Sequence, residues 1–117
     1  MKTNLYQPVP ELPVRDVVAA QEYYRDFLGF EITWTYPGNY IGAVARGDVG
    51  IFFRVAEEPF VTNIHWMAAD DVDATYTEMK EGGAQIIDPL EKKPWDIRQF
   101  TIEDLNGHIF YIFQANK

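Results

Sequence analysis

DVVAAQEYYRDFLGFEI (residues 16–32) and DVDATYTEMKEGGAQI (residues 71–86) are related stretches of one 117-residue chain, and their relation decides the fold. Asp16 matches Asp71 and, after a one-residue slip, Gly29 matches Gly83. The two copies begin 55 residues apart, about half the chain. This spacing indicates one duplicated module rather than a solenoid, whose repeats span about 20–50 residues.

Each copy predicts one amphipathic helix with a defined start and end. Asp16 and Asp71 are suitable N-caps, because a carboxylate accepts hydrogen bonds from the free backbone N–H groups of the first turn. Gly29 and the pair Gly82–Gly83 supply the left-handed residue that ends each helix. Apolar side chains recur on one face of each helix: Val17, Ala20, Tyr24, Phe27 and Leu28 in the first, and Val72, Thr75, Tyr76 and Met79 in the second.

β-prone runs bounded by turn residues predict one strand before each helix and three after it. The expected strands are 6–14, 30–36, 40–46 and 49–55 in the first half, and 62–68, 85–89, 98–103 and 108–114 in the second. The chain is therefore expected to be an α+β protein of tandem βαβββ modules, with curved mixed sheets around a cavity. We expect a single domain, residues 1–117, with modules at about 5–55 and 61–115 joined through VAEEPF (residues 55–60).

Composition narrows the possible partners. The chain has 10 Lys and Arg against 18 Asp and Glu, a net charge of −8. This surface repels phosphate backbones and argues against nucleic acid, whereas it serves solubility and could attract a cationic small molecule. The absence of cysteine excludes disulfides and thiolate sites and fits a reducing cytosol, so we expect a cytoplasmic protein. No run approaches the ~20 apolar residues of a membrane span, and no signal peptide, phosphate loop or Ser–His–Asp spacing is present.

Four stretches resemble the vicinal oxygen chelate superfamily, which includes glyoxalase I, bleomycin and fosfomycin resistance proteins and extradiol dioxygenases. They are LPVRDVVAAQEYYRDFLGFEI (12–32), ARGDVGIFFRV (45–55), DVDATYTEMKEGGAQI (71–86) and PWDIRQFTIEDLNGHIFYIF (94–113). Together they cover almost the whole chain. The resemblance implies the tandem βαβββ fold, but the same fold serves many functions.

Enzymes of that superfamily hold a divalent metal through His, Gln or Glu. The resemblance places the equivalent positions of this chain at Val9, Phe52, Ile64 and Tyr111. Aliphatic side chains and Phe offer no lone pair, and a neutral Tyr is a poor ligand for Zn²⁺, Mg²⁺ or Mn²⁺. We therefore expect no metal, no other cofactor and no catalytic residue.

Two enzymatic hypotheses stay open beside this one. A metal-dependent lyase or isomerase of the glyoxalase type would use His65, turned inward by a one-residue bulge, with other ligands at positions that the spacing does not reveal. A metal-free enzyme would use Glu11 or Tyr111 as an acid–base group. If neither enzymatic hypothesis holds, we expect His65 to be a hydrogen-bonded core residue against the helices, and His108 to lie in a solvated turn.

Period-two alternation places the neighbours of the four positions on the same inward faces. The expected ligand-binding residues are Glu11, Trp34, Phe52, Arg54, Ile64, Trp66, Trp95 and Tyr111. Trp34 could instead pack on its helix, and Phe60 is expected at the rim. Such an aromatic pocket suits a small or flat organic molecule.

The resemblance to bleomycin resistance proteins sharpens this expectation. Those proteins are metal-free homodimers that hold the antibiotic in a groove between subunits without changing it. We therefore expect a non-enzymatic homodimer that sequesters an aromatic or cationic ligand, such as a cationic aromatic antibiotic.

Overall fold

The computed structural model describes residues 1–115, which form two four-stranded sheets and two helices. The first half contains β1 (Glu11–Val14), α1 (Val17–Leu28), β2 (Glu31–Thr35), β3 (Ile41–Arg46) and β4 (Val49–Val55). The second half contains β5 (Ile64–Ala68), α2 (Val72–Glu81), β6 (Gln85–Lys92), β7 (Ile97–Glu103) and β8 (Ile109–Ala115).

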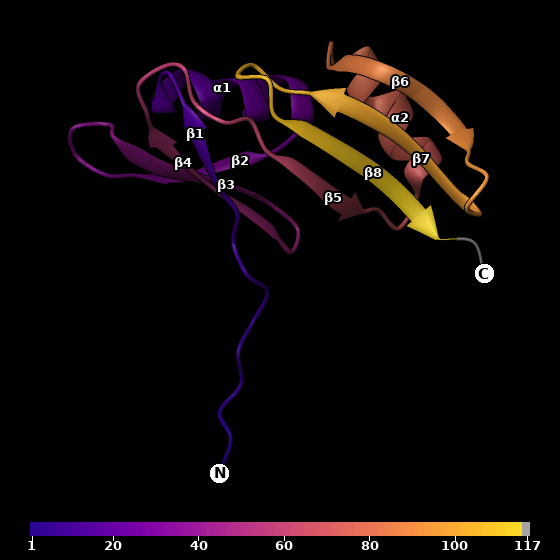
Figure 1. Cartoon of the computed structure of the whole chain (residues 1–117), viewed down its shortest axis with the longest axis horizontal. Coiled ribbons are helices and arrows are strands. Elements are labelled where there is room, and N and C mark those ends of the chain that lie inside the picture. The colour runs from indigo at the N-terminus through magenta and orange to yellow at the C-terminus, as the bar shows by residue number, and fades with distance from the viewer. Residues whose placement is uncertain (116–117) are drawn as a thin grey trace.

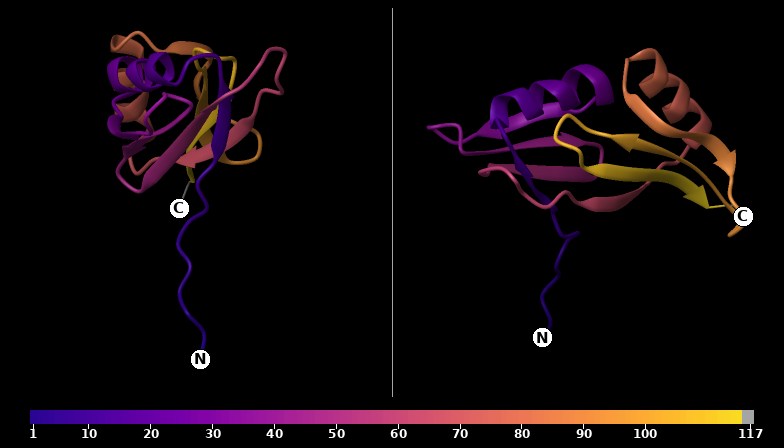
Figure 2. Two further views of the ribbon diagram at one scale, coloured as in Figure 1. Left: turned by 90° about the vertical axis from the view of Figure 1, so that its left-hand side faces the viewer. Right: turned by 45° about the horizontal axis from the view of Figure 1, so that its top comes forward.

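The two halves have the same topology, as the duplicated sequence predicts. The strand orders are β1-β4-β3-β2 and β5-β8-β7-β6, with β1 parallel to β4 and β5 parallel to β8. The other neighbouring strands are antiparallel. Figures 1 and 2 show both helices on the same side of the curved sheets. The predicted α+β class with tandem βαβββ modules is confirmed.

Both helices begin and end with the expected residues. Asp16 Oδ1 accepts the N–H of Ala19 at 2.8 Å, and Asp71 Oδ1 accepts the N–H of Ala74 at 3.0 Å. Gly29 ends α1 in the left-handed region at φ 76°. After α2, Gly83 takes that conformation, at φ 94°.

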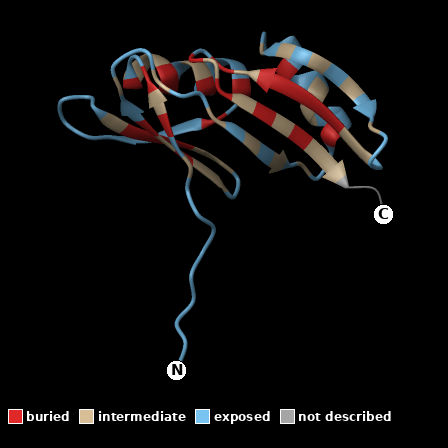
Figure 3. Cartoon of the chain, viewed as in Figure 1, coloured by how far each residue is buried: buried red, intermediate tan, exposed pale blue. Residues whose placement is uncertain are grey.

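One apolar core lies between the helices and the sheets and joins the two modules (Figure 3). Tyr24 of α1 packs against Phe53 of the first sheet at 4.9 Å and Phe110 of the second at 6.3 Å between ring centroids. Phe27 was expected on this buried stripe, but it is 39% exposed. Its ring lies instead beside Gly83, where a Cβ would come within 3.1 Å of Phe27 Cδ1.

A buried polar network binds the β7–β8 turn to the first module. Asp104 Oδ2 accepts a 2.6 Å hydrogen bond from the Tyr24 hydroxyl, and Asp104 Oδ1 accepts the N–H groups of Asn106 and His108, both at 2.9 Å. Asn106 Oδ1 accepts the N–H of Arg15 at 3.0 Å. These hydrogen bonds therefore join the β7–β8 turn of the second module to Arg15 and Tyr24 of the first, which are far away in the sequence.

His108 belongs to this network and is fully buried, so the expectation of a solvated position is wrong. Its Nδ1 accepts the N–H of Asn63 at 2.9 Å. Its Nε2 therefore carries the proton and donates to the carbonyl of Pro13 at 2.6 Å. Both ring nitrogens are used, which makes burial of this imidazole tolerable.

Two strand boundaries differ from the sequence-based expectation by three or more residues. The first strand begins at Glu11, not at residue 6, since Pro8 and Pro10 cannot donate to a ladder. Residues 1–9 form an exposed arm that runs away from the sheets (Figure 1). β6 extends to Lys92 through Pro89, because it is an edge strand whose register shifts around this residue. No helix among residues 1–115 is long and apolar enough to cross a membrane.

Replacing Tyr24 with Phe tests the junction between the modules. Loss of the hydroxyl leaves the buried Asp104 without one donor, so we expect the free energy of unfolding at pH 7 to fall by about 1–3 kcal/mol. Burial, and then the charge of Asp104, raise the pKa of Tyr24 well above 10.0. The folded state thus keeps a proton that the unfolded state releases, and stability should decline as the pH rises past about 10.

Urea unfolding at pH 7 and in the alkaline range measures both effects. The Tyr24→Phe protein should lose less stability than the wild type on the alkaline side. Tyr36→Phe is the control, since Tyr36 is 53% exposed. Equal losses for the two substitutions would contradict the role of the hydroxyl.

Candidate functional site

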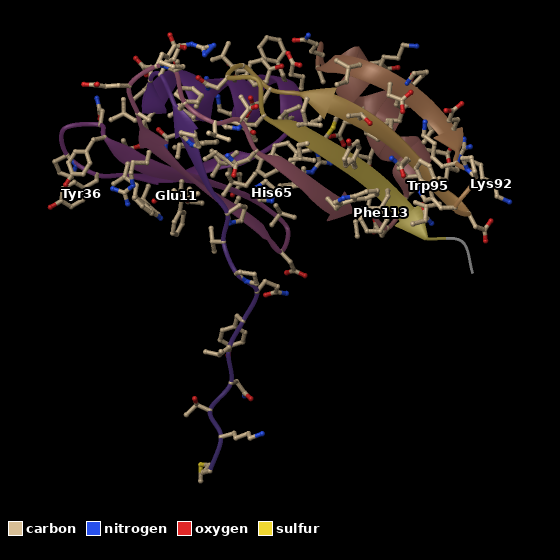
Figure 4. All side chains as sticks on the ribbon, viewed as in Figure 1. Glu11, Tyr36, His65, Lys92, Trp95 and Phe113 are labelled. Atoms are coloured by element: carbon tan, nitrogen blue, oxygen red, sulfur yellow. The ribbon has the colours of Figure 1, made fainter. Side chains whose placement is uncertain are left out.

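Each sheet has one face that its helix does not cover, which we name the first and second open faces. Glu11 pairs with Phe52, and Trp34 and Phe52 both pair with Ala43, so these side chains share the first open face. Arg54, two residues after Phe52, lies on the same face. On the second open face, Ile64, Trp66 and Tyr111 share a side with Ile109 and Phe113. Figure 4 shows Glu11 on the first sheet and Phe113 on the second.

A bulge in β2 directs Trp34 to the first open face. Ile32 pairs with Val44 on the helix side, and the register then shifts, so Trp34 and not Thr33 faces Ala43. Gln21 of α1 stabilises the irregular region, because its Nε2 donates to the carbonyls of Trp34 (2.9 Å) and Ala43 (3.2 Å). The alternative in which Trp34 packs on its helix together with Ile32 is wrong.

The first open face combines an aromatic pair with an ion pair. Trp34 and Phe52 meet nearly edge to face, with centroids 5.3 Å apart. Arg54 Nη2 and Nε lie 2.8 and 2.9 Å from Glu11 Oε1. Hydrogen bonding to Glu11, followed by its charge, raises the pKa of the Arg54 guanidinium. These two charges are exposed and available to a ligand.

The second open face is an aromatic platform. Trp66 lies 4.7 Å from Tyr111 and 5.6 Å from Phe113 between ring centroids. Trp66 is 52% and Ile64 60% exposed, although both are large and apolar. Exposed apolar side chains that lie together are typical of binding surfaces.

Trp95, in the β6–β7 connection, extends this platform. Its indole Nε1 donates to Gln99 Oε1 at 3.0 Å, and Gln99 pairs with Phe113 across β7 and β8. Trp95 itself is 55% exposed. Phe60, by contrast, stacks on the buried His108 with a centroid distance of 6.1 Å, so it does not form the rim.

The expected candidates thus form two groups. One group lies on each open face. The first group is Glu11, Trp34, Phe52 and Arg54, and the second is Ile64, Trp66, Tyr111 and Trp95.

The positions at which the resemblance would place metal ligands offer no suitable donor set. Val9 precedes β1 and lies on the exposed arm, and Phe52, Ile64 and Tyr111 supply at most one neutral phenol. β5 pairs with β8 without a register shift over Ile64–Ala68, so the bulge that would turn His65 inward is absent. No group of three or more His, Cys, Asp or Glu residues able to hold a metal occurs among the residues that the structure describes.

A family model for the Glyoxalase/Bleomycin resistance protein/Dioxygenase superfamily matches residues 7–112. The chain belongs to this superfamily. No curated protein matches it. The relation suggested by the sequence motifs is therefore confirmed at the level of the superfamily, which contains both binding proteins and enzymes.

Several solved structures share the fold of this chain. TioX from Micromonospora sp. ML1 superposes with a TM-score of 0.82 at 23% identity, covering 95% of this chain and 100% of TioX. The bleomycin-binding protein of bleomycin-producing Streptomyces verticillus, complexed with copper(II)-bleomycin, gives 0.78 at 22%, covering 99% and 100%. A glyoxalase-related enzyme from Clostridium phytofermentans gives 0.79 at 19%, covering 97% and 98%. At these identities the likeness shows the fold alone.

Sequence reasoning missed the residues that hold the two faces in place. The sequence patterns do not single out Gln21 of α1, which is 1% exposed, or Asp104 of the β7–β8 turn, which is 3% exposed. The run Asp104–Leu105–Asn106–Gly107–His108 carries three polar side chains within one turn, which is the signal that could have suggested a side-chain network.

Metal analysis tests whether these positions can hold a metal ion. Purified protein incubated with Zn²⁺, Ni²⁺ or Mn²⁺ and then dialysed should retain only substoichiometric metal, because Phe52, Ile64 and Tyr111 offer no imidazole or carboxylate. Inductively coupled plasma mass spectrometry measures the retained metal. One equivalent per chain after dialysis would overturn this expectation.

Proposed function

We propose that this protein binds and sequesters a cationic aromatic molecule between the open faces of two copies, without chemical change. The observation that carries the proposal is the chemistry of the second open face. Trp66, Tyr111 and Phe113 form a continuous aromatic surface. The resemblance to metal-dependent enzymes would place a metal ligand at one of these positions, Tyr111. Flat aromatic ligands stack on such rings, and cations bind over their faces.

The charge of the protein supports a cationic ligand. The net charge is −8, which raises the local concentration of cations and speeds their encounter. On the first open face, Glu11 can accept a hydrogen bond from a cationic group, with Arg54 holding its carboxylate in place. In this proposal the ion pair orients the ligand and the aromatic rings supply most of the contact area.

We propose a homodimer because each open face lacks a cover within one chain. A groove between two faces would bury Trp34, Trp66 and Ile64, which are 41%, 52% and 60% exposed. The arm gives a second reason, since Leu5 and Tyr6 are 92% and 87% exposed. Their burial against a second copy would contribute favourable free energy through the hydrophobic effect.

The superfamily neighbour from Streptomyces verticillus, solved with copper(II)-bleomycin, supports small-molecule binding by this fold. We extend the proposal to the biological role: sequestration in the cytoplasm would lower the free concentration of a toxic aromatic cation. A gene with this function would confer resistance to such a compound.

Replacing Trp66 with Ala tests the aromatic platform. We expect the wild type to bind bleomycin and the variant to bind it about tenfold more weakly, since a stacked or cation–π contact contributes on the order of 1–2 kcal/mol. Isothermal titration calorimetry measures both affinities. Low salt should strengthen binding if the charge contributes.

Tyr36→Ala is the matched control, because Tyr36 is also an exposed aromatic residue but lies in the β2–β3 connection against Tyr40. Its removal should leave the affinity unchanged. Absence of binding across bleomycin and other cationic aromatic compounds, including planar intercalating dyes, would refute the proposed ligand class.

Light scattering at several concentrations tests the dimer. The wild type should have twice the mass of the chain, and a Leu5→Asp, Tyr6→Asp variant should dissociate more readily, because two apolar contacts are replaced by charges. The control is Thr3→Asp with Gln7→Asp, which adds the same charge to the arm without removing an apolar side chain. A monomeric wild type would contradict a groove between subunits.

A further inference from the structure

A cavity of about 530 Å³ lies at the boundary between the two modules, apart from the network around Asp104. This volume is within the range of small-molecule sites. Residues 49–51 at the start of β4 and residues 65–68 of β5 form most of its wall. Its lining includes Val9, Asp48, Ile51, His65, Trp66 and Phe110.

His65 is the residue of this wall that has a buried polar atom without a hydrogen-bond partner. It pairs with Phe110 across β5 and β8, and the two rings stack with centroids 5.9 Å apart. The imidazole therefore lies on the helix side of the sheet, as expected. The expected hydrogen bonding is not present, since Nε2 is buried and has no partner.

This unpartnered atom is unusual within the molecule. In the part of the chain that the structure describes, His65 Nε2 is the one buried side-chain nitrogen or oxygen without a hydrogen bond. Buried polar atoms without partners are destabilising and often mark a function or a bound molecule. His108 shows the contrast, because both of its nitrogens have protein partners.

We propose that the cavity binds a small planar apolar molecule with one hydroxyl group, which pairs with His65 Nε2 once the imidazole turns this buried atom toward the space. The surrounding side chains favour an apolar body, since Val9, Ile51, Trp66 and Phe110 line the space. A hydroxyl suits the imidazole because it donates to one tautomer and accepts from the other. The Asp48 carboxylate in the same wall disfavours an anionic ligand.

This site is distinct from the open faces and does not depend on the proposed function. Trp66 borders both regions, but His65 and Phe110 lie on the opposite side of the second sheet from Tyr111 and Phe113. A ligand anchored on His65 is therefore separable from one stacked on the aromatic platform.

The chain has two histidines, so its imidazole nitrogens can be observed individually by NMR. We would titrate ¹⁵N-labelled protein with 2-naphthol and with naphthalene, which has the same rings without the hydroxyl. We expect 2-naphthol to bind about tenfold more tightly and to shift the His65 Nε2 resonance. The His108 resonances should stay in place, because its partners are internal.

His65→Phe keeps a ring on Phe110 but removes the nitrogen, so 2-naphthol should then bind no better than naphthalene. Tyr36→Ala, in the β2–β3 connection and outside both the cavity and the open faces, is the control and should retain the preference. An unshifted His65 Nε2 signal at saturation would assign its partner to water and overturn the proposal. Loss of the preference in Tyr36→Ala, or its retention in His65→Phe, would overturn it as well.

Discussion

The hydrogen bond from Tyr24 to Asp104 is the contact on which the arrangement of the modules depends. It is 2.6 Å long and buried, and it joins α1 of the first module to the β7–β8 turn of the second. The same carboxylate accepts two backbone N–H groups, so the turn cannot move without leaving buried polar groups unpaired. The Tyr24 ring meanwhile packs on both sheets, which couples the polar contact to the apolar core.

The positions of the helices decide which surfaces of the sheets stay open. Both helices cover the same side of the curved sheets, so the binding candidates are left on the other side of each sheet. A helix-facing residue is specified by packing, whereas an open-face residue is free to change with the ligand. The chain can therefore belong to the superfamily and share its fold although Phe52, Ile64 and Tyr111 are not metal donors.

The duplication made the fold predictable, since Asp16 and Asp71 start matching helices and the alternating strands follow at matching positions. Local patterns also placed Trp66 and Tyr111 on one face, because regular strands alternate with period two. What failed depended on distant partners. The burial of His108 by residues of the first module leaves no local signal in the sequence. The bulge in β2 leaves none either, although Trp34 lies on the expected face.

The two hairpin turns that occupy equivalent places in the modules show how the duplication diverged. The β7–β8 turn fills the boundary on its side with Asp104, Asn106 and His108, each of which makes a side-chain hydrogen bond there. The β3–β4 turn at Gly47–Asp48 is two residues long and carries no such network, and Asp48 lines cavities of about 530 and 400 Å³ on its side. The longer turn fixes the orientation of the modules, and this allows the shorter one to leave space. A hollow beside an unpaired His65 can therefore persist in the fold, because stability is supplied at the opposite end of the boundary.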